Sequence, residues 1–321
     1  MRGTPRSVPA LLATALLALA LAACGHTEGA ATPVPSATVI AAEDAEPDAP
    51  LGLQAPEPGA KAPTPVGGVP FPEISAGAAI VMDGDSMAVL YERNAHERRE
   101  PASVTKMATA ILVAENASMD AVFTSDIHHW DLDWDSSTMG LEPGDQLTVR
   151  DLLLGLMLVS GNDAAIVLGR HIAGSDEAFV DAMNVLAARL GLQDTHFMNA
   201  HGYSQDGHYS SAYDLALIAR YLMSIEALRE VVGTEQIVVM GVGADGAERE
   251  FDLYNHNPLL NYTPGVDGVK TGFTERAGRT FAATAVRDGH RVIVVILDAP
   301  MRAEDSIALI EWAYAAHTWP E

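Results

Sequence analysis

Residues 101–115 read PASVTKMATAILVAE, and this stretch decides the fold. After Lys106 the stretch is apolar on nearly every helical face, which predicts a helix buried in the centre of a domain rather than on its surface. The first turn of this helix nevertheless carries a serine and a lysine. Ser103 and Lys106 are three residues apart, so they share one face of that turn. A hydroxyl beside an amine at the start of a buried helix is a candidate nucleophile with its base.

The position of Lys106 favours an uncharged amine. A helix N-terminus carries partial positive charge, which disfavours a protonated amine there, and burial disfavours it further. A neutral lysine could accept the proton of Ser103, and the backbone N–H groups at the same helix end could stabilise an oxyanion. The alternative interpretation is a serine N-cap followed by a lysine whose stem lies along the helix.

Lysine is rare in this chain, which has 19 lysines and arginines together. Only three are lysines, namely Lys61, Lys106 and Lys270. Arginine stays protonated in proteins, whereas lysine can lose its proton and presents a compact charge. Lys61 lies in a stretch rich in proline and alanine. The other two lysines, Lys106 and Lys270, therefore indicate two positions in the folded part where arginine cannot replace lysine.

Composition narrows the possible classes of protein. The 321 residues, 48% of them hydrophobic, allow one large domain or two modest ones with a substantial core. The net charge of −24 argues against a nucleic acid partner, because no basic stripe is available to neutralise phosphates. The single cysteine excludes an internal disulfide framework and a cysteine-based zinc site. The adjacent His128 and His129 lack a third ligand at helical spacing. We therefore expect neither a metal nor a cofactor.

Residues 1–24 are typical of a targeting segment. Arg2 and Arg6 give a positive start, and residues 9–23 form an apolar run that is short for a membrane span. Residues 21–25, LAACG, resemble the cleavage box of bacterial lipoproteins. That resemblance implies cleavage before Cys24 and a lipid on its sulfur, which would anchor the protein to the outer face of the cell membrane. The alternative is an ordinary secretory signal with an incidental cysteine.

Residues 25–72 are rich in alanine, proline, threonine and valine, with an acidic cluster at 43–48. No apolar periodicity is present, which predicts a disordered tether between the lipid anchor and the folded part. We therefore divide the chain into a lipoprotein signal peptide at 1–24, a tether at 25–72 and a catalytic domain at 73–321.

The folded part has the pattern of an α+β domain. Two strands near its start and three near its end are expected to share one antiparallel sheet, with helices packed on it. A turn signal at 287–290 joins the last two strands as a hairpin. The predicted strands are 76–82, 87–92, 237–240, 249–254, 266–274, 279–286 and 291–298, and the predicted helices are 147–159, 163–171, 177–190, 211–223 and 302–317.

Two further motifs accompany the serine and lysine pair. Residues 160–162, SGN, form a short polar turn between two buried helices, for which a helix joint with glycine as the C-cap is the alternative explanation. Residues 270–272, KTG, begin with the third lysine. The pair His201-Gly202, in the predicted loop 196–208, could approach the site, although packing is the expected role.

These three motifs resemble the S-x-x-K, S-x-N and K-T-G motifs of penicillin-binding proteins and serine β-lactamases. Their order and separations are similar to those of the low-molecular-weight D-alanyl-D-alanine carboxypeptidases, peptidase family S11. The resemblance covers residues 74–314, including residues 199–203 and 266–274. It implies a β-lactamase/transpeptidase-like fold, with a five-stranded antiparallel sheet, packed helices and a mainly helical subdomain.

The resemblance also implies catalytic roles. Ser103 would attack the carbonyl between two D-alanines, and Lys106 would accept its proton. Lys270 would lower the pKa of Lys106 by like-charge repulsion. Ser160 would relay a proton to the leaving amine, and Asn162 would hold both the substrate amide and Lys106.

Substrate binding is implied for the third motif and its neighbours. Lys270 and Thr271 would face the terminal carboxylate of the substrate, and Gly272 would leave room for the peptide to add as a strand. The N–H of Phe273 would form an oxyanion hole with that of the catalytic serine. Arg302 falls where the family has a carboxylate-binding arginine, although a surface arginine is the alternative.

The expected function is therefore a serine D-Ala-D-Ala carboxypeptidase. It would act outside the cytoplasm on peptidoglycan stem peptides and be inhibited by β-lactams. A class A β-lactamase would need a deacylating glutamate, which we do not find, and usually carries Asp where this chain has Gly161. A DD-endopeptidase on the same fold stays open. The intact Ser103, Lys106 and Lys270 argue against a non-catalytic wall-binding lipoprotein.

Overall fold

The computed structural model describes residues 56, 57 and 59–320. The predicted signal peptide, Cys24 and most of the predicted tether lie outside these residues. Within the described part, none of the helices combines the length and the hydropathy that a membrane span requires.

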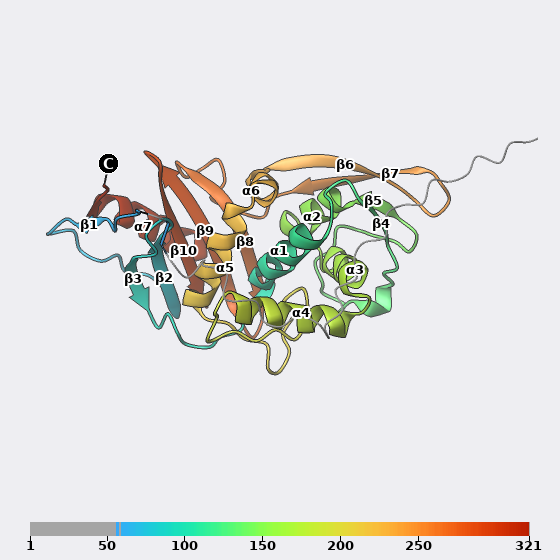
Figure 1. Ribbon diagram of the computed structural model, residues 1–321, viewed down its shortest axis with the longest axis horizontal. Helices are drawn as coiled ribbons and strands as arrows, with labels where there is room; N and C mark the ends of the chain where they lie inside the picture. Colours follow the sequence, from blue (N-terminus) through green and yellow to red (C-terminus); the bar gives the residue numbers. More distant parts are fainter. Residues whose placement is uncertain (1–55, 58, 321) are drawn as a thin grey trace, which may run out of the picture. The chain divides into compact units, whose positions relative to one another are not determined.

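A five-stranded antiparallel sheet forms one half of the domain, as predicted (Figure 1). Its strand order, β3-β2-β10-β9-β8, joins two strands from the start of the folded part to three from its end. The turn at 287–290 does connect β9 to β10 as a hairpin. The strands are β2 (Ala78–Asp83), β3 (Val89–Arg93), β8 (Val266–Thr274), β9 (Gly278–Arg287) and β10 (His290–Leu297).

The sheet is buried on both faces, which explains why its central strands are continuous apolar runs. Helix α5 (Ala212–Ser224) covers one face, and helix α7 (Arg302–Ala315) covers the other. Alternate side chains of β2 serve the two sides: Ile80 joins the core that contains α5, and Val81 joins the core that contains α7.

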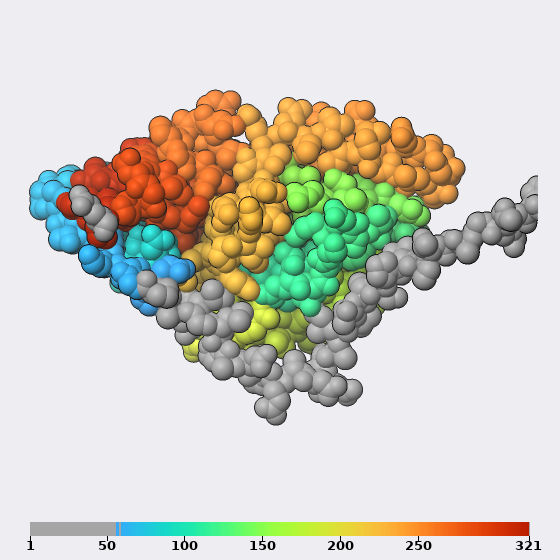
Figure 2. Space-filling view, turned by 45° about the horizontal axis from the view of Figure 1, so that its top comes forward, coloured from blue at the N-terminus to red at the C-terminus, as the bar shows by residue number. Residues whose placement is uncertain are grey.

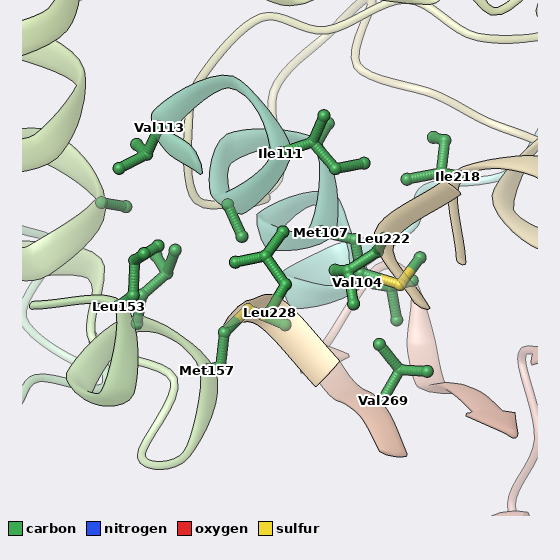
Figure 3. Packing of buried hydrophobic residues seen from close by; sticks show 14 of the residues in the cluster. Val104, Met107, Ile111, Val113, Leu153, Met157, Ile218, Leu222, Leu228 and Val269 are labelled. Atoms are coloured by element: carbon green, nitrogen blue, oxygen red, sulfur yellow. The ribbon is translucent and has the colours of Figure 1, made fainter. Parts of the chain in front are cut away.

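The other half is helical and is centred on α1 (Lys106–Asn116). This helix contacts five other helices, and all its residues from Lys106 to Val113 are buried, as the sequence predicted. Met107 and Ile111 of α1 belong to one cluster of buried side chains with Met157 of α2 and Val269 of β8 (Figure 3). The surrounding helices are α2 (Val149–Met157), α3 (Asn162–Ala173), α4 (Asp176–Arg189) and α6 (Glu226–Gly233).

Three details differ from the predicted elements. Ser103 lies on a 3₁₀ turn, Ala102–Thr105, and the α-helix begins only at Lys106. The predicted helix 147–159 begins with a strand, although the Thr148 side chain does cap α2 by accepting from the Asp151 N–H. Two three-residue strands were not predicted, because such short elements show no periodicity. Helix α6 was also not predicted, although its buried Leu228, Val231 and Val232 have helical spacing. The smaller sheet has the order β4-β5-β6-β7, with β4 at Val122–Thr124, β5 at Gln146–Thr148, β6 at Gln236–Val242 and β7 at Glu248–Tyr254.

The ordered domain begins before residue 73, so the predicted tether extends too far. Strand β1 (Thr64–Pro65) pairs with β11 (His317–Thr318) near the end of the chain. The ring of Phe71 lies 5.2 Å from that of Trp312 and 5.7 Å from that of Tyr91. Figure 2 shows these blue N-terminal residues lying against the red C-terminal segment. A two-residue strand and one aromatic side chain leave no pattern that a composition-based prediction could detect.

Candidate active site

A cavity of about 720 Å³ lies between the two halves of the domain. The 3₁₀ turn before α1, the junction between α2 and α3, the loop around Gly202 and the edge strand β8 line it, together with residues 134–137, His256 and Arg302. Lys106 and Lys270 are only 0% and 1% exposed, and each contacts a residue of the cavity wall. The structure thus brings all nine predicted site residues of the folded part to one place. Seven of them line the cavity: Ser103, Ser160, Asn162, Thr271, Gly272, Phe273 and Arg302.

The amine of Lys106 contacts three oxygen atoms. Its Nζ lies 3.1 Å from Ser103 Oγ, 2.6 Å from Asn162 Oδ1 and 2.8 Å from the carbonyl oxygen of His201. Ser103 is not a helix cap, since the N-cap position of α1 is held by Thr105. The interpretation of these residues as an N-cap with a passive lysine is therefore wrong.

The surroundings of Lys106 favour its neutral form. Burial lowers the pKa of Lys106 well below its ordinary value, and the nearby Lys270 lowers it further. Asp163 acts in the opposite direction and raises the pKa of Lys106. Burial and like-charge repulsion prevail over the attraction of the carboxylate, so the structure provides an amine that can accept a proton beside a serine hydroxyl.

The basic side chains of Lys270 and Arg302 lie at the β8 side of the cavity. Lys270 donates to the carbonyl oxygen of Thr271 at 3.0 Å, and Arg302 donates to that of Gly272 at 3.2 Å. Burial and then Arg302 lower the pKa of Lys270 to about 7. Arg302 lines the cavity, so it is not the plain surface arginine that the sequence left open. This end of the cavity is suited to an anionic group.

The S-G-N turn places two side chains in the cavity. Ser160 adopts a left-handed conformation, with φ of 65°, two residues after Leu158, the C-cap of α2. Gly161 is the N-cap of α3 rather than a C-cap glycine, so the simple helix-joint explanation is wrong. The left-handed residue is the serine, and a non-glycine residue there is a local strain of the kind found at functional sites.

His201 and Gly202 belong to the site, although the sequence suggested packing. The carbonyl oxygen of His201 accepts from Lys106, and burial lowers the pKa of the His201 ring to about 3. Gly202 has a φ of +85°, and a Cβ there would lie 1.9 Å from the carbonyl oxygen of Ala102. Only glycine allows this loop to approach the catalytic turn so closely.

Sequence reasoning missed several cavity residues that come from loops. Ser136 accepts a hydrogen bond from Asn162 Nδ2 at 3.0 Å, and Tyr203 donates to Asp135 at 3.0 Å. His256 also lines the cavity, and burial, Lys270 and Arg302 lower its pKa. No local motif marks Asp135, Ser136 or His256, because only the three-dimensional fold brings them to the cavity. Tyr203 does belong to the stretch 199–203 that resembles the family.

The sequence model of the D-alanyl-D-alanine carboxypeptidases matches residues 65–301. The chain belongs to this family, peptidase S11. It is 37% identical over 227 residues to the D-alanyl-D-alanine carboxypeptidase DacF of Bacillus subtilis, covering 70% of this chain and 57% of DacF. It is 32% identical to DacB2 of Mycobacterium tuberculosis, covering 78% of this chain and 86% of DacB2. The chain thus spans less than two thirds of DacF.

Solved structures confirm the fold of this S11 chain. The Streptomyces K15 DD-transpeptidase has a TM-score of 0.74 and 34% identity, covering 77% of this chain and 100% of that one. Penicillin-binding protein 6B of Escherichia coli has a TM-score of 0.69 and 35% identity, covering 78% and 81%. The predicted family and the predicted transpeptidase-like α+β fold are therefore both confirmed.

Proposed function

We propose that the chain is a serine D-Ala-D-Ala carboxypeptidase that removes the terminal D-alanine from peptidoglycan stem peptides. One observation carries this proposal. The buried Nζ of Lys106 lies 3.1 Å from Ser103 Oγ and is held by two further oxygens, in a chain of the S11 family. A neutral amine has two hydrogens and one lone pair. If the hydrogens go to Asn162 Oδ1 and the His201 carbonyl, the lone pair faces the hydroxyl of Ser103.

Acylation then proceeds with each proton accounted for. Ser103 Oγ attacks the carbonyl carbon between the two D-alanines, and its proton passes to Lys106. The N–H groups of Ser103 and Phe273 stabilise the oxyanion. As the carbon–nitrogen bond breaks, the proton on Lys106 passes through Ser160 to the nitrogen of the leaving D-alanine.

Deacylation reverses the direction of the proton. Water attacks the ester carbon, and one of its protons passes to Lys106. The bond from carbon to Ser103 Oγ then breaks, and Lys106 returns the proton to that oxygen. The shortened peptide leaves with a new carboxylate, and the free enzyme is restored. The same acyl-enzyme step with a β-lactam gives an inhibited complex.

The terminal carboxylate of the substrate binds at the cationic end of the cavity, to Lys270, Thr271 and Arg302. Gly272 supports this placement because it removes a side chain from the edge strand β8, along which an extended peptide can add. Arginine and protonated lysine near one point give a carboxylate charge-assisted hydrogen bonds.

The proposed location is extracytoplasmic, with a lipid on Cys24 anchoring the protein to the membrane. The apolar run at 9–23 and the LAACG box at 21–25 support this part of the proposal. A mass measurement on the membrane-bound protein tests it. Cleavage before Cys24 with acyl chains on that residue is expected, and an unmodified cysteine would contradict it.

A second candidate is acyl transfer to an amine instead of water. The full-length match to a DD-transpeptidase favours keeping this candidate. Both reactions share the acyl-enzyme on Ser103 and differ only in the acceptor that attacks it. Cleavage of cross-linked dimers by a DD-endopeptidase also uses the same intermediate.

Product analysis by mass spectrometry tests the proposal. A stem pentapeptide should lose one D-alanine and give the tetrapeptide, with glycine present as a competing amine acceptor. A glycine adduct as the main product would indicate a transpeptidase, and faster cleavage of a cross-linked dimer would indicate an endopeptidase. Rapid turnover of penicillin would indicate a β-lactamase. If penicillin neither labelled the peptide that contains Ser103 nor was hydrolysed, all four enzymes would be refuted.

The substitution Lys106→Arg tests the general base. It keeps the charge but removes the group that can become neutral, so we expect penicillin labelling to fall by roughly 1,000-fold. Lys61→Arg is the matched control, because it makes the same change at an exposed position. Full labelling of the Lys106→Arg protein would contradict the assigned role.

A further inference from the structure

Asp163 is a buried carboxylate beside the site that the proposed mechanism does not use. It follows Asn162 in the first turn of α3 and is 1% exposed. Its oxygens accept from the N–H groups of Met139 at 3.0 Å, Gly140 at 2.9 Å and Leu141 at 3.0 Å. Asp163 therefore holds a distant segment against the start of α3.

The segment that Asp163 holds continues directly into the cavity wall. Ser136 and Ser137 line the cavity, and both contact the residue before Asp163. The backbone N–H of Asn162 donates to the Ser137 carbonyl at 2.8 Å, and Asn162 Nδ2 donates to Ser136 Oγ at 3.0 Å. Residues 136–141 are thus fixed at both ends to the first two residues of α3.

This arrangement determines which way the Asn162 amide points. Its nitrogen is directed to Ser136, so its oxygen is left for Lys106 Nζ at 2.6 Å. If the segment 136–141 moved away, the amide would lose the partner of its nitrogen. Among the described residues, the bond from Lys106 itself would then be the remaining side-chain hydrogen bond that directs the amide oxygen of Asn162 at the amine.

Gly161 is required by the same arrangement. A Cβ at this position would lie 2.6 Å from Asp163 Oδ1 and 3.2 Å from the backbone nitrogen of Met139. Any side chain there would push the carboxylate and the segment apart. The central glycine of the S-G-N motif is therefore explained by Asp163 rather than by the turn alone.

We propose that Asp163 is a positioning residue, which holds residues 136–141 so that Asn162 faces Lys106, and which places a buried carboxylate next to the residue that contacts this amine. This inference rests on the proposed function, in which Lys106 is the base. Two titratable groups shift the pKa of this amine, Lys270 from β8 and Asp163 from α3. The ring of His201, from the loop before α5, lies close enough for Lys106 to lower its pKa. Asp163 is the one that favours the protonated form, so loss of its charge should lower the pKa of Lys106 further.

Two variants separate the two parts of the inference. Asp163→Asn removes the charge and places an amide among N–H donors, whereas Gly161→Ala disturbs the segment and keeps the charge. The rate of penicillin acylation at Ser103 is measured from pH 5 to pH 10 for each. We expect the plateau rate to fall by roughly 10-fold in both variants, because the amide of Asn162 is misplaced. The low-pH side of the pH–rate profile, its acid limb, reports the protonation of Lys106. This limb should move to lower pH only for Asp163→Asn.

Asp305→Asn is the matched control. Asp305 is also a buried carboxylate in the first turn of a helix, and it accepts from the N–H and hydroxyl of Ser75. Neither of these two residues lines the cavity. Its variant should lose thermal stability without any change in the acid limb. A neutral Asp163→Ser variant repeats the test should the asparagine variant fail to fold.

Each outcome has a separate meaning. If the acid limb of the Asp163→Asn variant coincided with that of the wild type, the charge of Asp163 would have no effect on the pKa of Lys106, and the electrostatic part of the inference would be wrong. A wild-type plateau rate in Gly161→Ala would overturn the positioning part. If the wild-type chain were not acylated at Ser103, the proposed function itself would be wrong.

Discussion

The backbone of Gly272 passes so close to Ser103 that a Cβ at position 272 would lie 2.8 Å from the Ser103 backbone nitrogen. The same Cβ would lie 2.4 Å from Thr280 Oγ1. Thr280 in turn donates to the carbonyl oxygen of Pro101 at 2.9 Å, which ties β9 to the catalytic turn. The edge strand β8 and the turn are therefore packed together with no room for a side chain at position 272.

We expect Gly272→Ala to reduce the rate of penicillin acylation by roughly 100-fold. The added methyl group would separate β8 from the turn, so that the N–H groups of Ser103 and Phe273 no longer point at one oxyanion. Labelling with a fluorescent penicillin measures the rate. Gly67→Ala is the control, since nothing lies within 4 Å of its Cβ position. Acylation of the Gly272→Ala protein at the wild-type rate would contradict the close approach.

The two cations near β8 predict a pH dependence for substrate binding. Burial and then Arg302 lower the pKa of Lys270 to about 7. Only the protonated lysine attracts the carboxylate of the substrate, so kcat/KM for a pentapeptide should fall as the pH rises through about 7. Arg302→Gln removes the like charge and should raise the pKa of Lys270, which moves this alkaline limb to higher pH.

Arg302→Gln should also raise KM by roughly 10-fold, because a charge-assisted hydrogen bond to the carboxylate is lost. Arg150→Gln is the matched control, since Arg150 is a surface residue paired with Glu230. The Arg150→Gln variant should change neither KM nor the alkaline limb of kcat/KM. An alkaline limb that stays in place in Arg302→Gln would show that Lys270 does not determine it.

Lys270 also predicts a pH dependence of stability. The pKa of this lysine is about 7 in the folded protein and 10.5 ordinarily, so the unfolded chain binds the extra proton between these values. Stability should therefore rise with pH across this window, and the full cost of burying the charge is present below about pH 7. Lys270→Met removes that cost, on the order of 5 kcal/mol as an upper limit.

We expect Lys270→Met to raise the thermal midpoint more at pH 6 than at pH 10. Lys61→Met is the control, because Lys61 is exposed and should show the same midpoint change at both pH values. A pH-independent effect of Lys270→Met would mean that the lysine is not buried with a lowered pKa.

The sequence predicted the parts of the site that lie in local patterns. Ser103 and Lys106 share one turn, and Lys270 could be recognised because lysine is otherwise so rare in this chain. Strands β2 and β10 of the main sheet were predictable because burial on both faces makes them apolar runs. The same reasoning correctly placed α1 at the centre of the helical half.

The remaining site residues could not be predicted for identifiable physical reasons. His201 contributes a backbone carbonyl, which carries no sequence signal. His256 and Ser136 come from loops that only the fold brings to the cavity. Asp163 resembles an ordinary acidic residue in the first turn of a helix, and its role depends on a segment more than 20 residues earlier.

Because the ordered domain begins before residue 73, a chain that begins at residue 59 should be more stable than one that begins at residue 73. The shorter chain loses β1 and its neighbouring bond from the Val66 N–H to the Ala316 carbonyl, together with the ring contacts of Phe71. These contacts are worth about 2 to 3 kcal/mol together. The thermal midpoint should therefore fall by roughly 4 to 8 °C.

Activity should respond differently from stability in this comparison. Phe71 contacts Tyr91 of β3 and Trp312 of α7, whereas the cavity lies at β8, the opposite edge of the sheet. Both chains should therefore acylate at equal rates at 20 °C, while Trp312, now 8% exposed, shifts its fluorescence to the red in the shorter chain. Phe71→Ala in the longer chain should reproduce about half of the midpoint change. Equal midpoints for the two chains would mean that residues 59–72 are a tether after all.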